Sequence, residues 1–293
     1  MDGCLKPGLA QIVLSICMAI VGANSMWAQE PPLPEHRRIA QTEVSGRRIE
    51  LSSLKGAVLF AGPKIKPDRK VPLVIHFHGA PWLVQYQVAE RLPDAVLITI
   101  QLGAGSSVYG RPFEKTAVFR ELLDESGRML GIKREWSSIT LSGFSAGYGA
   151  IRAILRDAGN LSRIHNVLLL DGIHASYSPE GVPLASGGKV NTADVDSFEV
   201  FARQAIAGKK VMVLTHSQIH PATYASTTEC VDHLLGVLGL SRTMVAGKDS
   251  SGMIGTTRVD RKGFHVRGYF GTSAADHVDH LHSMSEWLGL LKL

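Results

Sequence analysis

One stretch, SITLSGFSAGYGA from residue 138 to residue 150, constrains the fold of this chain more than any other. A short β-favouring run, Ile-Thr-Leu, meets Gly143-Phe-Ser-Ala-Gly147, and a helix-compatible run follows at once. This order predicts a strand, a sharp turn and a helix. The apex of such a turn has a strained backbone, so the residues two positions on either side must be small, as Gly143 and Gly147 are. We therefore interpret Ser145 as a nucleophile near the positive end of the helix, with an ordinary strand-to-helix turn as the alternative.

The N-terminal region has the pattern of a secretory signal peptide. A basic residue precedes an apolar run over residues 9–23, and small residues offer cleavage after Ala23 or Ala28. The run is shorter than the roughly 20 residues that a membrane-spanning helix needs, so no stable membrane anchor is expected. We expect a leader over residues 1–28, a single catalytic domain over 29–293, and export to the periplasm or the medium.

Composition favours a globular enzyme over a nucleic-acid-binding protein. The 293 residues are 45% hydrophobic, which is enough to build the full core of one α/β domain. Cys4 and Cys17 fall inside the expected leader and leave Cys230 alone in the remaining chain, so no internal disulfide is expected. The formal net charge of +5 is spread along the chain, without a basic run that contains aromatic residues. We therefore expect no nucleic-acid partner.

Predicted strands and helices alternate along the chain. Strands are expected at 36–44, 47–51, 57–61, 71–77, 95–102, 166–170, 210–215 and 264–270, and helices at 82–91, 113–130, 194–207, 228–238 and 276–291, besides the strand and helix around Ser145. The first strands should form an antiparallel edge. The alternation predicts an α/β fold with a mostly parallel central sheet, helices on both faces, and a ligand site outside the carboxyl ends of the strands. The segment 172–192 is too short for a large cap domain, so an open cleft is expected.

A serine hydroxyl needs a base to remove its proton, so the nucleophile hypothesis requires a histidine. Of the twelve histidines, His277 is the best placed, because it follows the last predicted strand at the start of the terminal helix. His280 and His282 are its neighbours in that helix. We expect both to point elsewhere, as solvated helix residues.

A carboxylate should orient that histidine. Asp171 ends a predicted strand and precedes a glycine, which places it at the carboxyl edge, with a turn or capping role as the alternative. Glu229 and Asp232, after the following strand, are the reserve candidates. Backbone N–H groups must also stabilise the oxyanion. Ala146 would supply one, and Ala80 the second, because the proline after it has no N–H.

Together these features resemble the α/β-hydrolase superfamily from about residue 50 to the end. The resemblance rests on His78-Gly79 after the third strand of that fold, the turn at 143–147 and the late His277. It implies the nucleophile, base and oxyanion roles given above. The chain departs from the family at the acid, which usually follows the next-to-last strand, because the segment 210–221 has no carboxylate. Some members use the end of the preceding strand instead, and Asp171 matches that variant.

The resemblance and the expected export imply a carboxylic ester as substrate, either a small molecule or one linked to a polysaccharide. Trp82, Tyr109 and Tyr177 are the candidate substrate-binding residues, with ordinary packing as the alternative. We predict a serine hydrolase that forms an acyl-enzyme and needs no cofactor.

Other functions stay open at this point. The acid's unusual position is compatible with a catalytically silent binding protein, and the same triad also serves peptidases and acyltransferases. Residues 276–282 are dense in metal-ligand types, so metal-dependent hydrolysis is a further alternative. We expect no metal, because no second cluster supplies ligands at recognisable spacing.

Overall fold

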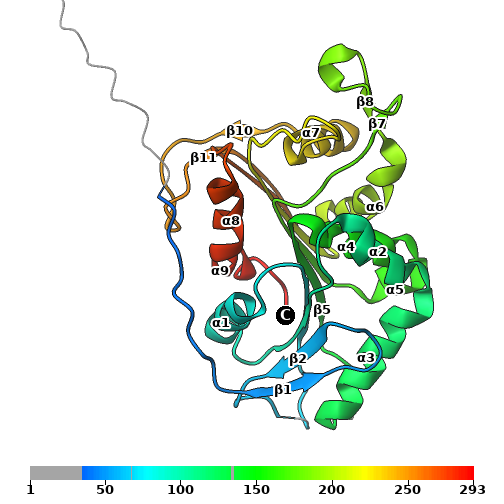
Figure 1. Ribbon diagram of the computed structural model, residues 1–293, viewed down its shortest axis with the longest axis vertical. Helices are drawn as coiled ribbons and strands as arrows, with labels where there is room; N and C mark the ends of the chain where they lie inside the picture. The colour runs from blue at the N-terminus through cyan, green and yellow to red at the C-terminus, as the bar shows by residue number, and fades with distance from the viewer. Residues whose placement is uncertain (1–34, 67, 133–134) are drawn as a thin grey trace, which may run out of the picture. The chain divides into compact units, whose positions relative to one another are not determined.

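The computed structural model describes residues 35–66, 68–132 and 135–293 (Figure 1). Within these ranges a ten-stranded sheet has the order β1-β2-β4-β3-β5-β6-β9-β12-β11-β10. Its strands are β1 (Arg47–Glu50), β2 (Ala57–Ala61), β3 (Leu73–Phe77), β4 (Val96–Ile100), β5 (Ile139–Phe144), β6 (Asn166–Leu170), β9 (Val211–His216), β10 (Thr243–Met244), β11 (Gly255–Arg261) and β12 (Phe264–Tyr269). The six strands from β4 to β12 in that order are parallel, and antiparallel pairs lie at both edges. The predicted α/β class and the antiparallel edge are confirmed.

The central strands are continuous apolar runs because the sheet is covered on both faces. Every residue of β3, β4 and β6 is buried. The register places Phe77 beside Gly143, Gly143 beside Leu169, and Leu170 beside Thr215. The carboxyl ends of β3, β5, β6 and β9 therefore finish at one edge of the sheet.

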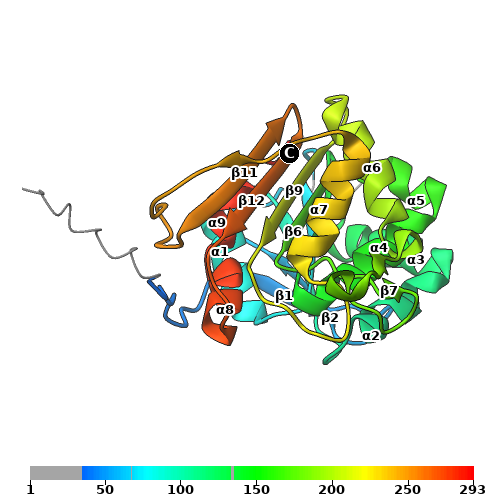
Figure 2. The same ribbon diagram turned by 90° about the horizontal axis from the view of Figure 1, so that it is seen from above.

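Helices pack on both faces of the sheet (Figures 1 and 2). One face carries α1 (Pro81–Arg91), α8 (Ala274–His282) and α9 (Met284–Leu288), and the other carries α2 (Ser106–Gly110), α3 (Thr116–Leu130), α4 (Tyr148–Arg156), α5 (Ala158–Arg163), α6 (Asp196–Ile206) and α7 (Thr227–Leu238). Each face has its own apolar cluster. Leu281 and Trp287 belong to the first cluster, and Ile151 and Phe198 belong to the second.

Several segments differ from the sequence-based expectations. The strand expected at 36–44 is wrong: this segment has no strand pairing and instead contacts α8, where the Ile39 N–H donates to Nδ1 of His282 (3.1 Å). The strand β11, which lies between β12 and the edge strand β10, was not expected, because its sequence GTTRVDR is mostly polar. The segment 172–192 forms no domain, but it contains the short strands β7 (Tyr177–Ser178) and β8 (Lys189–Val190).

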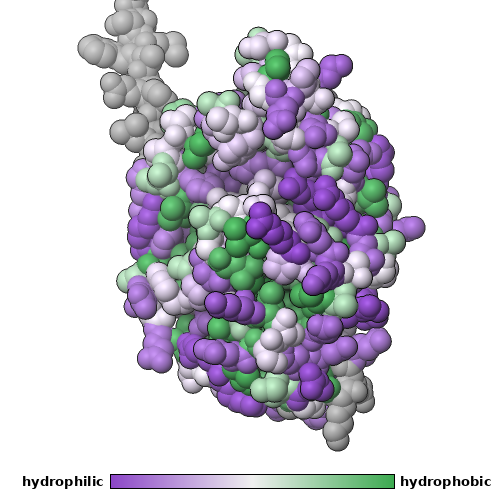
Figure 3. Space-filling view, turned by 45° about the vertical axis from the view of Figure 1, so that its right-hand side comes forward, coloured by the Kyte–Doolittle hydropathy of each residue, from purple (hydrophilic) through white to green (hydrophobic). Residues whose placement is uncertain are grey.

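The expected leader lies outside the described residues. Among the helices that the structure describes, none combines the length and apolar character needed to span a membrane. Cys230 is buried as a free thiol. On the face shown in Figure 3, hydrophilic residues surround a smaller hydrophobic area, in keeping with a mildly charged, mixed surface.

Candidate active site

The predicted site residues follow neighbouring strands at the carboxyl edge of the sheet. His78 follows β3, Ser145 follows β5 and Asp171 follows β6, while His277 lies on α8, which comes after β12. The strands β3, β5 and β6 are adjacent in the sheet, and β9 alone separates β6 from β12. Parallel strands thus bring residues that are far apart in sequence to one edge.

Ser145 lies at the apex of a tight turn between β5 and α4. Its φ of +47° is in the left-handed region, which non-glycine residues rarely adopt. A Cβ on Gly147 would lie 2.1 Å from the backbone oxygen of Phe77, so only glycine fits there. A Cβ on Gly143 would lie 3.1 Å from the Gly147 carbonyl carbon. The small residues are therefore required because strand, turn and helix pass so closely.

Asp171 is buried, with 2% of its surface exposed, and its carboxylate accepts four hydrogen bonds. Oδ1 accepts from the Ser217 N–H (2.9 Å) and the Thr227 hydroxyl (2.8 Å), and Oδ2 accepts from the Ser217 hydroxyl (2.7 Å) and His277 Nδ1 (2.7 Å). Burial opposes its charge, but the interactions with His280, His277 and the Ser217 N–H hold the pKa of Asp171 below its ordinary value. The carboxylate is therefore charged and oriented at neutral pH.

His277 lies in the first turn of α8, where a capping box of Ser273 and Asp276 fixes the start of the helix. Its Nδ1–H donates to Asp171, which leaves Nε2 free to accept a proton. The ring packs against Phe144, with the ring centroids 4.6 Å apart. No hydrogen bond joins His277 to Ser145 among those of the described residues, but both line one cavity.

The turn after β3 lies beside the nucleophile turn, because Phe77 pairs with Gly143 and His78 lines a cavity together with Ser145. His78 has a φ of +67°, and its Nδ1 lies 2.9 Å from the Tyr109 hydroxyl. Gly79 donates its N–H to Gln101 (3.2 Å), whereas no hydrogen bond of the described residues uses the Ala80 N–H. The N–H of Ala146 belongs to the first turn of a helix, where such groups have no partner in the helix itself.

Ser145 is shared by two cavities. The larger cavity has a volume of about 570 Å³ and is also lined by His78, Ala146, Tyr148, Arg152 and Asp194. The smaller cavity has a volume of about 300 Å³ and is also lined by Asp171, Ile219, Pro221 and His277. His174 and Tyr224 line both. Sequence reasoning missed these two residues, although His174 stands only three positions after Asp171.

Comparisons with known proteins identify the fold. No family model and no curated protein matches the sequence. Among solved structures, the chain is similar to a protein named FAE, with a TM-score of 0.50 and 11% identity over 89% of this chain and 93% of that one. The chain has the α/β-hydrolase fold.

Two further solved structures are similar to this chain. A feruloyl esterase module from Clostridium thermocellum matches with a TM-score of 0.49 and 11% identity, over 89% of this chain and 93% of that one. An acylaminoacyl peptidase from Pyrococcus horikoshii matches with a TM-score of 0.44 and 14% identity over 83% of this chain. This chain spans only 40% of that peptidase.

The three aromatic residues expected in the cleft lie elsewhere in this α/β-hydrolase fold. Tyr109 is fully buried, and its hydroxyl is bonded to His78, to the Leu102 N–H and to the Gly103 carbonyl. Tyr177 is also buried, and its hydroxyl donates to Glu229. Trp82 lines a separate cavity. None of the three is among the lining residues of either cavity that contains Ser145.

The reserve acids have other partners. Glu229 forms the capping box at the start of α7 with Ser226, and Asp232 pairs with Arg242 on the surface. The place after β9, where the α/β-hydrolase acid usually lies, holds Ser217, which donates to Asp171 instead. The expectation that His280 is a solvated helix residue is wrong. His280 is fully buried, and its Nδ1 lies 2.7 Å from the Thr215 hydroxyl.

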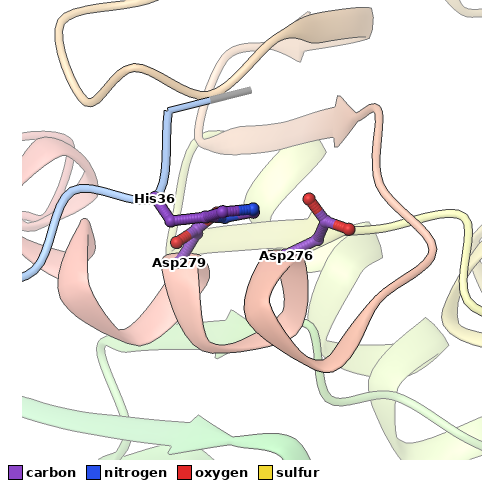
Figure 4. Close-up of side chains that lie close together, drawn as sticks. All are labelled: His36, Asp276 and Asp279. Atoms are coloured by element: carbon purple, nitrogen blue, oxygen red, sulfur yellow. The ribbon is translucent and has the colours of Figure 1, made fainter. Parts of the chain in front are cut away.

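The carboxylates of α8 that have ligand-type neighbours already have partners in the protein. His36, Asp276 and Asp279 have ligand atoms within 4.8 Å of one another (Figure 4). Asp279 is already paired with His36 (2.8 Å) and with the guanidinium of Arg38. Asp276 accepts from the N–H and hydroxyl of Ser273 as a helix cap. An arginine in contact with the carboxylate disfavours a cation there, because like charges repel.

Proposed function

We propose that this chain is an exported serine hydrolase that cleaves carboxylic esters through an acyl-enzyme. Ser145 is the nucleophile, His277 the general base and Asp171 the acid that orients it. The observation that carries the proposal is the 2.7 Å hydrogen bond from His277 to the buried Asp171, in a cavity that Ser145 also lines. A base held by a carboxylate beside a serine is the arrangement that activates a hydroxyl nucleophile.

The chemistry follows from these positions. Nε2 of His277 takes the proton of Ser145 as the serine oxygen attacks the ester carbonyl. The N–H groups of Ala80 and Ala146 stabilise the oxyanion that forms. His277 then donates the proton to the departing alcohol, and a water molecule later attacks the acyl-enzyme with the same residue as base. Asp171 stays charged throughout and stabilises the imidazolium.

The proposal is tested by labelling the purified protein with a fluorophosphonate and locating the modified residue by peptide mass spectrometry. We expect an adduct on Ser145 that is lost in Ser145→Ala and strongly slowed in His277→Gln. Ser186→Ala is the matched control, because Ser186 is exposed and lines neither cavity. A folded protein without an adduct on Ser145 would contradict the proposal and favour the silent binding protein. Turnover of amides but not of esters would identify a peptidase instead.

Export forms a separate part of the proposal. It rests on the apolar run at 9–23 and on the small residues that offer cleavage after Ala23 or Ala28. The test is expression of the full chain in a bacterial host, followed by fractionation and N-terminal sequencing. We expect mature protein in the periplasm or medium, beginning after one of these alanines. Uncleaved protein in the cytoplasm would refute this part without affecting the catalytic proposal.

A further inference from the structure

The two cavities that share Ser145 differ in which catalytic group they contain. The smaller cavity is lined by His277, and the larger one is lined by Ala146 and His78 on the oxyanion side. The proton for the leaving alcohol comes from the histidine, so the alcohol must lie on the His277 side. On the proposed mechanism, the acyl half of the ester therefore lies in the larger cavity.

The larger cavity ends in a fixed pair of charges. Arg152 Nη1 donates to Oδ1 of Asp194 (2.9 Å), and both side chains are about four-fifths covered. Oδ2 of Asp194 accepts from the N–H and hydroxyl of Ser176 (2.9 and 2.7 Å). The guanidinium lies 5.3 Å from the centroid of the Tyr148 ring, which also lines the cavity. The position of the arginine is thus set by several contacts, which is what a specificity-determining group requires.

Arg152 keeps donors for a ligand. Among the hydrogen bonds of the described residues, only its Nη1 group is used, so Nε–H and both Nη2–H groups have no protein acceptor. Arg152 follows Ser145 by seven residues. Ser145 lies in the helical turn that leads into α4, so at roughly 1.5 Å of rise per helical residue the two backbones are about 10 Å apart. An extended acyl group attached to Ser145 can therefore reach these donors with its far end.

The charge of the pair indicates the kind of group it accepts. Asp194 neutralises Arg152, so the end of the cavity offers hydrogen-bond donors without a net positive charge. We infer that the larger cavity binds the acyl half of the substrate, and that Arg152 selects long acyl groups with an uncharged oxygen acceptor at the far end. The acceptor is a hydroxyl, ether or carbonyl oxygen. This inference rests on the proposed serine hydrolase activity.

The test compares three 4-nitrophenyl esters with one leaving group and eight-carbon acyl chains that end in a methyl group, a hydroxyl or a carboxylate. A hydrogen bond from a charged donor changes affinity by about tenfold or more. Arg152→Met keeps an unbranched apolar stem but removes the N–H donors, so the hydroxyl-to-methyl ratio of kcat/KM should fall about tenfold. In Asp194→Asn the unneutralised arginine should shift preference toward the carboxylate by about tenfold.

Arg120→Met is the matched control, because Arg120 is an exposed residue of α3 that does not line the cavity. It should leave all three rates unchanged. Moving the hydroxyl to the alcohol half, as in 8-hydroxyoctyl against octyl acetate, should abolish the effect of Arg152→Met. An unchanged hydroxyl-to-methyl ratio in folded Arg152→Met overturns the inference. If that variant does not fold, Asp194→Asn decides, and an unchanged carboxylate-to-methyl ratio of kcat/KM in that variant overturns the inference.

Failure of the inference is distinguishable from failure of the proposed function. If the wild-type protein hydrolyses these esters in a Ser145-dependent way but Arg152 has no influence on the far end, only the inference falls. If no ester is turned over at all, both fall together.

Discussion

Replacement of Asp171 by asparagine tests the least usual feature of the site, the position of its acid. Asparagine has the same shape, so Oδ1 can still accept from the Ser217 N–H and the Thr227 hydroxyl. The Ser217 hydroxyl, which now donates to the carboxylate, can rotate and accept a hydrogen bond from the new amide. We therefore expect a loss in the free energy of unfolding of only about 1 kcal/mol.

The contact with His277 cannot adapt in the same way. The amide would donate where Oδ2 now accepts from Nδ1, so the imidazole would have to carry its proton on Nε2. That tautomer cannot take a proton from Ser145. An acid-to-amide change of this kind lowers kcat by about 10³- to 10⁴-fold, which corresponds to about 4 to 5.5 kcal/mol.

The assay is steady-state hydrolysis of 4-nitrophenyl acetate, with thermal unfolding as a check on the fold. Glu229→Gln and Asp232→Asn are the matched controls, because neither carboxylate contacts His277 and both should retain wild-type kcat. The reasoning fails if Asp171→Asn keeps kcat within threefold of the wild type. It also fails if one of the control variants shows the large loss instead.

Three further predictions follow from other parts of the structure. Burial lowers the pKa of His76 and His216 to about 4, so between pH 6.5 and 4 the unfolded chain binds protons that the folded chain does not. The free energy of unfolding should therefore fall by about 3 kcal/mol for each histidine over this range. Urea unfolding at pH 7, 5.5 and 4.5 measures the change, and equal midpoints would contradict it. Gly147→Ala should lower the free energy of unfolding by about 3 kcal/mol in the same assay, because the added Cβ meets a backbone oxygen. Gly127→Ala in α3 is the control and should be neutral or stabilising, because its Cβ meets no other atom. Similar losses for the two variants would refute the close approach at Gly147. Dialysis against a chelator should leave esterase activity unchanged, because the carboxylates of α8 already have partners in the protein. Loss of activity that added zinc restores would contradict this prediction.

The sequence predicts those parts of the site that depend on local chain geometry. The turn around Ser145 can be predicted from the sequence because its glycines are required by short-range contacts. Gly143 contacts Gly147, and Gly147 contacts the adjacent strand. Asp171 is readable because a polar residue ends a continuous apolar strand. His277 is readable because it follows the last parallel strand of an alternating chain.

The remaining features depend on how distant segments pack. Ser217 and Thr227, which hold Asp171, come from different elements and have no sequence signal of their own. His280 looks like a solvated helix residue, yet it lies on the face of α8 that packs against the sheet, with Thr215 as its partner. Tyr109 has the character of a cleft residue but is used to position His78. Tertiary contacts decide each of these cases.

Backbone strain in this protein is concentrated where the chemistry is proposed. Among the described residues, five non-glycine residues have positive φ, and three of them are His78, Ser145 and Asp171. Such conformations each cost about 1–3 kcal/mol and persist only because the surrounding structure imposes them. Glycine at any of the three would relieve that cost and remove a side chain of the site. Selection for thermal stability alone would therefore erode activity first, and a library screened only for a higher melting temperature should accumulate inactive variants at these positions.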